Sequence, residues 1–461
     1  MPYTLNLRRV LISLNMLLIS SFFVHFAAAA ELSIRIKGFD DFNDLSTQKA
    51  GRDGADMPAF MKQLSTDQRM SDIDVGDVLN LALDLELEYS FLVDNKVANG
   101  GNRFSIIATS IRGLKLLLSI DGNAVYGSVS GNGHNYTIST DHDFGMILID
   151  QSHDDFPEID FGHDALVPPT QNAKASGIEQ MTVSEKQSFF DVRTRVADES
   201  IITMLFVYSP EFAQGFGSPE ARINDLLNFT NQAMADSGVY LRFTLARAEE
   251  VDFDNSLSTG TTLTQVTNGQ GAFAGVGALR DQVGADMVAV LSFANNFSAN
   301  GVAWVNGSNP NFAFSSTRLS PQCCNSVFAH ELGHNLGSGH ERASVNSVAS
   351  SPCSFNLTGF SCGHGNADRN WGTLMSRLNS RNAGNVFSNP LSNNCLGEPC
   401  GIAEGSSEAA DNTRSFNMSR FVVANFRDDP LGSDSPAPAG PTNNDNPFLT
   451  AIFSLLFDSS E

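Results

Sequence analysis

The stretch FAHELGHNLGSGHE, residues 328–341, places three histidines and two acids within fourteen residues. The whole chain has only nine histidines in 461 residues, so this clustering needs an explanation. On a helix, residues i and i+4 lie on one face about one turn apart, and the imidazoles of His330 and His334 can therefore reach a single ion. Glu331 projects beside them, where it can hold a water molecule. The spacing predicts a metal site on a helix.

The residues that follow strengthen this prediction, because Gly337 and His340 complete the pattern H-E-x-x-H-x-x-G-x-x-H. A glycine three residues after the second histidine lets the backbone leave the helix through a left-handed conformation. The chain can then bring His340 back to the same ion as a third ligand. Three nitrogen ligands with one open position are typical of catalytic zinc. The alternative is a buried histidine cluster without an ion, which would need partners for three imidazoles.

Composition limits the classes of partner. The net charge is −23 and the pI about 4.6, which argues against nucleic acids and anionic membranes, since both bind through Lys and Arg. Hydrophobic residues make up 41% and charged residues 17%, as in globular proteins. A well-solvated surface explains the acidity, and calcium (Ca2+) binding and life in salty water are the alternatives.

The first thirty residues read as a secretory signal peptide. Two arginines precede an apolar run, VLISLNMLLISSFFVHF, and small residues end it at Ala30. An anchoring helix is the alternative, and no later segment is long and apolar enough to span a membrane.

All the cysteines lie in one later region, and an even number in an exported chain predicts disulfides with 15 possible connectivities. These are Cys323, Cys324, Cys353, Cys362, Cys395 and Cys400.

The rest of the chain divides by composition. Residues 31–165 read as β-rich, with short alternating runs such as RFSIIATSI and GMILIDQS separated by Gly, Asn and Asp. Residues 166–198 are polar and irregular, and we expect a processing protease to cut near Arg193 and Arg195. From residue 199 to about 430, buried strands such as IITMLFVYS alternate with helices, which predicts an α/β sandwich. Residues 431–461 form a linker and an apolar tail.

A methionine, Met375, follows the three histidines in the sequence. WGTLMSRLN supplies Met375, and three-histidine zinc sites of this pattern lie over a methionine turn. Together with LRDQVGADMVAVL, GVAWV and NVFSNP, these motifs resemble the metzincin zinc endopeptidases. The nearest resemblance is to the reprolysin (adamalysin)-like branch, which includes secreted bacterial members and the peptidyl-Asp metalloendopeptidases. It extends over about residues 200–427.

This resemblance implies a fold and a set of roles. The fold would be α/β, with a mixed twisted sheet, an active-site helix and a C-terminal subdomain, preceded by a β-rich pro-domain. One zinc ion (Zn2+) would bind the three histidines, Glu331 would act as general base, and Met375 would form the methionine turn. Residues 387–390, including Phe387 and Pro390, would line the pocket for the residue after the scissile bond. Trp304 would lie on the edge strand that holds substrate by strand addition.

Two positions depart from the family patterns. Reprolysins usually carry Asp after the third histidine, whereas this chain has Glu341, as astacins do. Glu341 can pair with the N-terminus created by processing or with an arginine; the alternative is an exposed acid. Astacins carry Tyr two residues after the methionine, where this chain has Arg377. Arg377 would favour acidic substrate side chains or lie on the surface.

The sequence also bears on latency and function. Residues 1–322 contain no cysteine, which excludes a cysteine switch. The segment DFGHD, residues 160–164, offers groups that could block a metal, although ordinary linker polarity is the favoured interpretation. The prediction is a secreted, monomeric zinc metalloendopeptidase made as a zymogen and acting on extracellular proteins. The alternatives are an adhesin or toxin-like binding module on the same scaffold, and a zinc hydrolase of non-peptide substrates.

Overall fold

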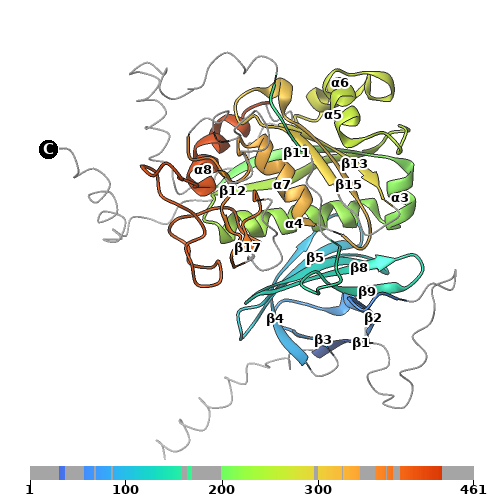
Figure 1. Ribbon diagram of the computed structural model, residues 1–461. Helices are drawn as coiled ribbons and strands as arrows, with labels where there is room; N and C mark the ends of the chain where they lie inside the picture. Colours follow the sequence, from blue (N-terminus) through green and yellow to red (C-terminus); the bar gives the residue numbers. More distant parts are fainter. Residues whose placement is uncertain are drawn as a thin grey trace, which may run out of the picture. The chain divides into compact units, whose positions relative to one another are not determined.

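The computed structural model describes residues 31–36, 57–66, 69–84, 87–157, 164–168, 199–294, 300–323, 325–342, 353, 359–369, 371–376 and 385–427 (Figure 1). Contacts within the chain divide it into two units, residues 1–427 and residues 428–461. Every described residue belongs to the first unit. The expected signal peptide, the processing site at Arg193 and Arg195 and the apolar tail all lie outside the described residues.

The β-rich part of the chain closes into a barrel. Its strands follow the order β1-β2-β9-β8-β7-β6-β5-β4-β3, and neighbours are antiparallel except for the pair β1 and β3. Tight turns connect several of them; between β7 and β8, Asn132 and Gly133 both have positive φ, as a two-residue hairpin requires. The bounds are β1 Glu31–Ile36, β2 Met61–Thr66, β3 Val78–Asp84, β4 Leu87–Ala98, β5 Arg103–Ser110, β6 Lys115–Asp121, β7 Ala124–Gly131, β8 His134–Asp141 and β9 Gly145–Asp150.

The second part is a mixed sheet with helices, in agreement with the predicted α/β architecture. In the described part of the chain its strand order is β10-β14-β15-β13-β11-β12, with β14 antiparallel to β15 and the other neighbours parallel. The strands are β10 Ala165–Leu166, β11 Ser200–Tyr208, β12 Leu241–Glu250, β13 Met287–Phe293, β14 Asn300–Trp304 and β15 Phe314–Leu319. The helices are α3 Pro210–Phe216, α4 Pro219–Asp236, α5 Thr259–Thr267, α6 Val276–Gln282, α7 Asn325–Asn335 and α8 Asn412–Val423.

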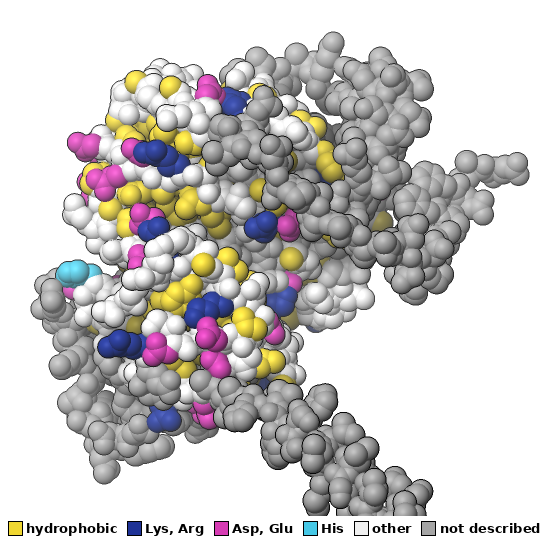
Figure 2. All heavy atoms as spheres, turned by 180° about the vertical axis from the view of Figure 1, so that it is seen from behind, with side chains coloured by type: hydrophobic (Ala, Val, Ile, Leu, Met, Phe, Trp, Pro, Cys, Tyr) yellow, Lys and Arg dark blue, Asp and Glu magenta, His cyan; other side chains and the backbone are white. Residues whose placement is uncertain are grey.

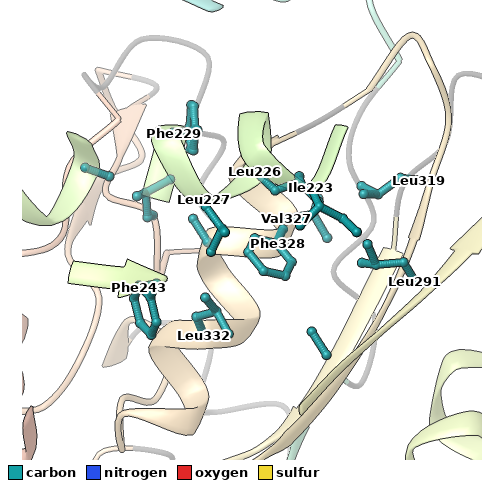
Figure 3. Packing of buried hydrophobic residues seen from close by; sticks show 14 of the residues in the cluster. Ile223, Leu226, Leu227, Phe229, Phe243, Leu291, Leu319, Val327, Phe328 and Leu332 are labelled. Carbon is teal, nitrogen blue, oxygen red and sulfur yellow. The ribbon is translucent and has the colours of Figure 1, made fainter. Parts of the chain in front are cut away.

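Helix α4 forms where the sequence predicted it. The Ser218 side chain accepts a hydrogen bond from the Ala221 N–H, Pro219 occupies the first turn, and Gly238 follows the helix with φ +79°. Its apolar face packs against α7, as Figure 3 shows for Ile223 and Leu226 near Val327 and Phe328. Each fully buried side chain of this kind contributes roughly 1.5–3 kcal/mol. Helix α4 therefore supports the helix that carries the histidines.

The barrel meets α4 through polar side chains. The Asn228 amide donates to the hydroxyls of Ser105 on β5 and Ser119 on β6, at 2.7 and 2.9 Å. Ser218 donates to Asp121 at 2.8 Å, and Tyr126 packs edge-on against Phe216. These contacts join the barrel and the mixed sheet within one unit.

The surface and the C-terminal part complete the described structure. Figure 2 shows basic and acidic side chains interspersed over the described part of one face, as on a well-solvated surface.

Two short strands, β16 Gly365–Asn366 and β17 Trp371–Gly372, precede α8. Two of the expected disulfides are Cys353–Cys362 and Cys395–Cys400, and Cys323 is also disulfide-bonded. Among the described helices, none has the length and apolar character to cross a membrane.

Candidate active site

Helix α7 carries the first part of the motif into the interior, and its residues are all buried. The helix ends as predicted, because Gly337 has φ +100°. A Cβ at Gly337 would also lie 3.2 Å from the Asn306 carbonyl oxygen, a tight contact that adds to the conformational preference for glycine. The Asn306 N–H donates to the His334 carbonyl at 3.0 Å, which ties this end of α7 to the segment after β14.

The three imidazoles meet at one point. Their ring centroids are 4.6 Å apart for His330 and His334, 5.2 Å for His330 and His340, and 4.8 Å for His334 and His340. Two of the rings have a fixed tautomer, because a carbonyl oxygen can only accept. His330 Nδ1 donates to the Leu374 carbonyl at 2.5 Å, and His334 Nδ1 donates to the Ser338 carbonyl at 2.8 Å. In the neutral rings, each Nε2 therefore keeps a lone pair for a ligand.

Asp164 completes the cluster from outside the motif. Its Oδ1 lies 2.9 Å from His340 Nε2 and its Oδ2 lies 3.4 Å from His330 Nε2. The residue is only 1% exposed. Burial would raise the pKa of this carboxyl, but hydrogen bonds to His330 and His340, together with their charge, hold it well below its ordinary value. The favoured sequence interpretation, ordinary linker polarity, is wrong for Asp164.

The donor set fits a metal ion. One ligand atom from each of Asp164, His330, His334 and His340 lies within 4.8 Å of the others. His334 Nε2 is buried and has no hydrogen-bond partner in the described part of the chain. Burial lowers the pKa of His334 well below its ordinary value, and the neighbouring histidines add to this effect, so the ring is neutral. Three imidazole nitrogens and one carboxylate oxygen suit zinc; calcium prefers oxygen ligands and has no support in this set.

A short strand holds Asp164 in place. Residues 165–166 form β10, which pairs in parallel with β14 in the register Ala165↔Ala303 and Leu166↔Trp304. The Ala303 N–H donates to the Asp164 carbonyl and the Val305 N–H donates to the Leu166 carbonyl, both at 2.8 Å. The segment thus adds a strand to β14 next to the histidines.

Met375 lies below α7, in a turn in which the Ser376 N–H donates to the Thr373 carbonyl at 2.8 Å. The residue is fully buried. A Cβ at Gly333 would lie 2.2 Å from the Met375 sulfur, so the thioether sits directly against the helix between His330 and His334. The role of Met375 as a methionine turn stays a prediction that this placement supports.

The expected pocket residues lie in different environments. Phe387 is fully buried, packs edge-on against Phe416 and lies close to Gly333. Pro390 is partly exposed. Trp304 lies on β14, but its indole N–H donates to Thr267 on α5 at 2.9 Å, so it packs on the side of α5. Arg377 lies outside the described residues.

Glu341, the residue after the third histidine, is 3% exposed. The exposed-acid alternative is therefore wrong. Glu341 directly follows His340, so residues 328–341 carry two buried carboxyl groups, those of Glu331 and Glu341.

Comparisons with known proteins agree with this geometry. Residues 198–388 match the model of metallo-peptidase family M12. A peptidyl-Asp metalloendopeptidase of Pseudomonas aeruginosa is 26% identical over 277 residues, which are 54% of this chain and 44% of that protein. A second enzyme of that name, from Stenotrophomonas maltophilia, is 30% identical over 207 residues, which are 43% of this chain and 46% of that protein. The chain thus spans less than half of either relative.

Two solved structures are more distant. The crystal structure of metalloproteinase-II from Bacteroides fragilis has a TM-score of 0.35 and 13% identity, covering 57% of this chain and 81% of that one. A chaperone–substrate complex has a TM-score of 0.40 and 16% identity, covering 77% and 44%. At these scores neither structure adds to the argument. The family match and the two curated relatives identify residues 198–388 as a reprolysin-like, metzincin-type peptidase domain of family M12.

Proposed function

We propose that the chain is a secreted zinc-dependent metalloendopeptidase made as a zymogen. In the zymogen, Asp164 would occupy the fourth ligand position of the zinc, which the attacking water needs. The observation that carries the proposal is the convergence of three imidazoles and Asp164, with the buried Glu331 next to His330 on the same helix. The predicted signal peptide and the disulfides support secretion.

Each side chain has a role in this proposal. His330, His334 and His340 hold zinc through Nε2, and the Leu374 and Ser338 carbonyls orient the first two rings. Zinc, when bound, supplies Lewis-acid chemistry that polarises the scissile carbonyl and makes water more acidic. Glu331 takes the proton from the attacking water and passes it to the leaving amine.

Substrate binding follows from the pairing of β14. The Ala303 and Val305 N–H groups, which now bind the Asp164 and Leu166 carbonyls, become free when the segment leaves. An extended peptide can then bind them by strand addition. The curated relatives are named for peptidyl-Asp cleavage, and we extend a preference for aspartate to this chain. Arg377, two residues after Met375 in the sequence, is the proposed cation for the acidic side chain.

Latency follows from Asp164. Its carboxylate would supply the fourth ligand and so exclude water from the open position that a catalytic zinc site needs. Cleavage near Arg193 and Arg195 would separate Asp164 and β10 from the catalytic domain. No cysteine is required for this arrangement, which agrees with their absence from residues 1–322.

The test is cleavage of casein by the processed protein, with metal analysis of the same sample. We expect about one zinc per chain and activity that Glu331→Ala abolishes while zinc is retained. A Glu331→Ala protein that cleaves casein at the wild-type rate would show that the activity belongs elsewhere. Absence of zinc from folded protein would remove the proposed site.

A further inference from the structure

Gly301 on β14 faces the side chain of Glu331 on α7. A Cβ at Gly301 would lie 2.2 Å from Glu331 Oε1, 2.5 Å from its Cγ and 2.6 Å from its Cδ. Real Cβ atoms essentially never approach other heavy atoms within 3.0 Å. Even the smallest side chain at position 301 would thus require Glu331 or one of the two elements to move.

The glycine is needed for space rather than for its backbone conformation. The φ of Gly301 is outside the left-handed region, so other residues can adopt its backbone conformation. It lies within β14, paired opposite Thr317 of β15. The missing side chain at Gly301 is therefore matched to the carboxylate of Glu331.

Neither element can easily give way. Glu331 is fully buried, and α7 packs against both β14 and β15. The Asn335 side-chain amide donates to the Trp304 carbonyl on β14 and to the Phe314 carbonyl on β15, both at 3.0 Å. These bonds fix the distance between the helix and the two strands. An added methyl group would therefore displace the carboxylate itself.

We propose that Gly301 is a positioning residue for Glu331: its lack of a side chain leaves the space in which the general base holds its reactive orientation. Glu331 acts on substrate and Gly301 acts only through it. The catalytic part of this inference rests on the proposed function, whereas the steric part does not.

The steric part is tested by a double-mutant cycle on the thermal unfolding of the full chain. The variants are Gly301→Ala, Glu331→Ala and the double variant, with Gly277→Ala as control, because Gly277 is exposed on α6 and a Cβ there meets nothing within 4 Å. Gly301→Ala should lower Tm when Glu331 is present and leave it unchanged in the Glu331→Ala background. If Gly301→Ala alone fails to fold, folding of the double variant supports the proposal equally. Equal losses in both backgrounds would overturn it.

The catalytic part is tested on the processed, zinc-loaded protein. Gly301→Ala should lower kcat on the order of 100-fold, since a misplacement of about 1 Å has that effect, while KM and zinc content stay near wild type. Wild-type kcat in this variant would overturn the assignment. If the wild-type protein cleaves no peptide at all, the proposed function fails, and the Tm cycle still decides whether Gly301 positions the Glu331 side chain.

Discussion

The carboxylate of Asp164 lies 2.9 Å from Nε2 of His340, although 176 residues separate the two in sequence. Strand β10 holds this contact, because the Ala303 N–H on β14 and the Val305 N–H just after it donate to the Asp164 and Leu166 carbonyls. The group that would block the metal and the segment that would fill the substrate strand position are thus one continuous piece of chain. Removal of that piece would free both positions together.

Replacing Asp164 should weaken latency. Asp164→Ala in the unprocessed chain removes the fourth ligand, so small peptides should be cleaved before processing, at a rate below that of processed protein because β10 still covers β14. The cobalt-substituted protein should also change its visible absorption as water replaces the carboxylate. Asp154→Ala, at an exposed acid of the same half of the chain, is the control. No change in either measurement would contradict the role given to Asp164.

Replacing Glu331 should separate chemistry from metal binding. Glu331→Gln keeps the shape of the side chain but cannot take a proton, so kcat should fall at least about 100-fold with zinc content unchanged. Steady-state kinetics and metal analysis of one preparation measure both quantities. A loss of zinc in parallel with activity would mean that Glu331 serves the site structurally.

Removing the metal should lower stability. A ligand that binds only the folded state stabilises it by about 2.7 kcal/mol at 100 times its Kd. Chelation should therefore lower Tm, and added zinc should restore it. His334→Ala should abolish this response, because it removes an Nε2 that is buried without a protein partner in the described structure. A zinc-dependent Tm in His334→Ala would place the ion elsewhere.

The buried pair Arg222 and Asp225 should matter far more than an exposed pair. Arg222 Nη1 lies 2.5 Å from Asp225 Oδ2, both side chains are at most 3% exposed, and Asn325 at the start of α7 bonds to both. Asp225→Ala should destabilise the protein by about 3–5 kcal/mol because it leaves a buried charge unpaired. Glu199→Ala breaks the exposed pair with Arg242 and should change stability by less than about 1 kcal/mol. Denaturant unfolding measures both.

Peptide cleavage should depend on an acidic residue. Peptides with Asp should be cleaved faster than matched peptides with Asn, and Arg377→Ala should reduce that difference more than it reduces cleavage of neutral peptides. A library profile with mass-spectrometric detection measures this preference. Equal cleavage of the Asp and Asn peptides would remove the specificity proposed from the named relatives.

The sequence predicts local structure well where short-range chemistry decides it. The turn at Gly337 follows from the need for positive φ, and α4 follows from the Ser218 cap, Pro219 and the apolar face. The α7 spacing correctly brings His330 and His334 together. These features depend on residues within about a dozen positions of each other.

Long-range features could not be predicted in the same way. Nothing near Asp164 in the sequence indicates that the strand after it pairs with β14. The sequence alone therefore favours ordinary linker polarity for this carboxyl group. The need for a glycine at position 301 cannot be predicted from the sequence either, because it depends on the approach of α7 to β14 and not on backbone conformation. The parallel pairing of β1 with β3, which contributes to the closure of the barrel, is also a long-range contact.

A crystal structure of the zinc-loaded full chain, with the ion located by anomalous diffraction, would test the proposed zinc site and its block by Asp164 together. We expect one zinc at about 2.0–2.2 Å from Nε2 of His330, His334 and His340 and from one carboxylate oxygen of Asp164. An ion bound elsewhere would contradict the proposed zinc site, and a water molecule in the place of the Asp164 oxygen would contradict the role of Asp164 in latency.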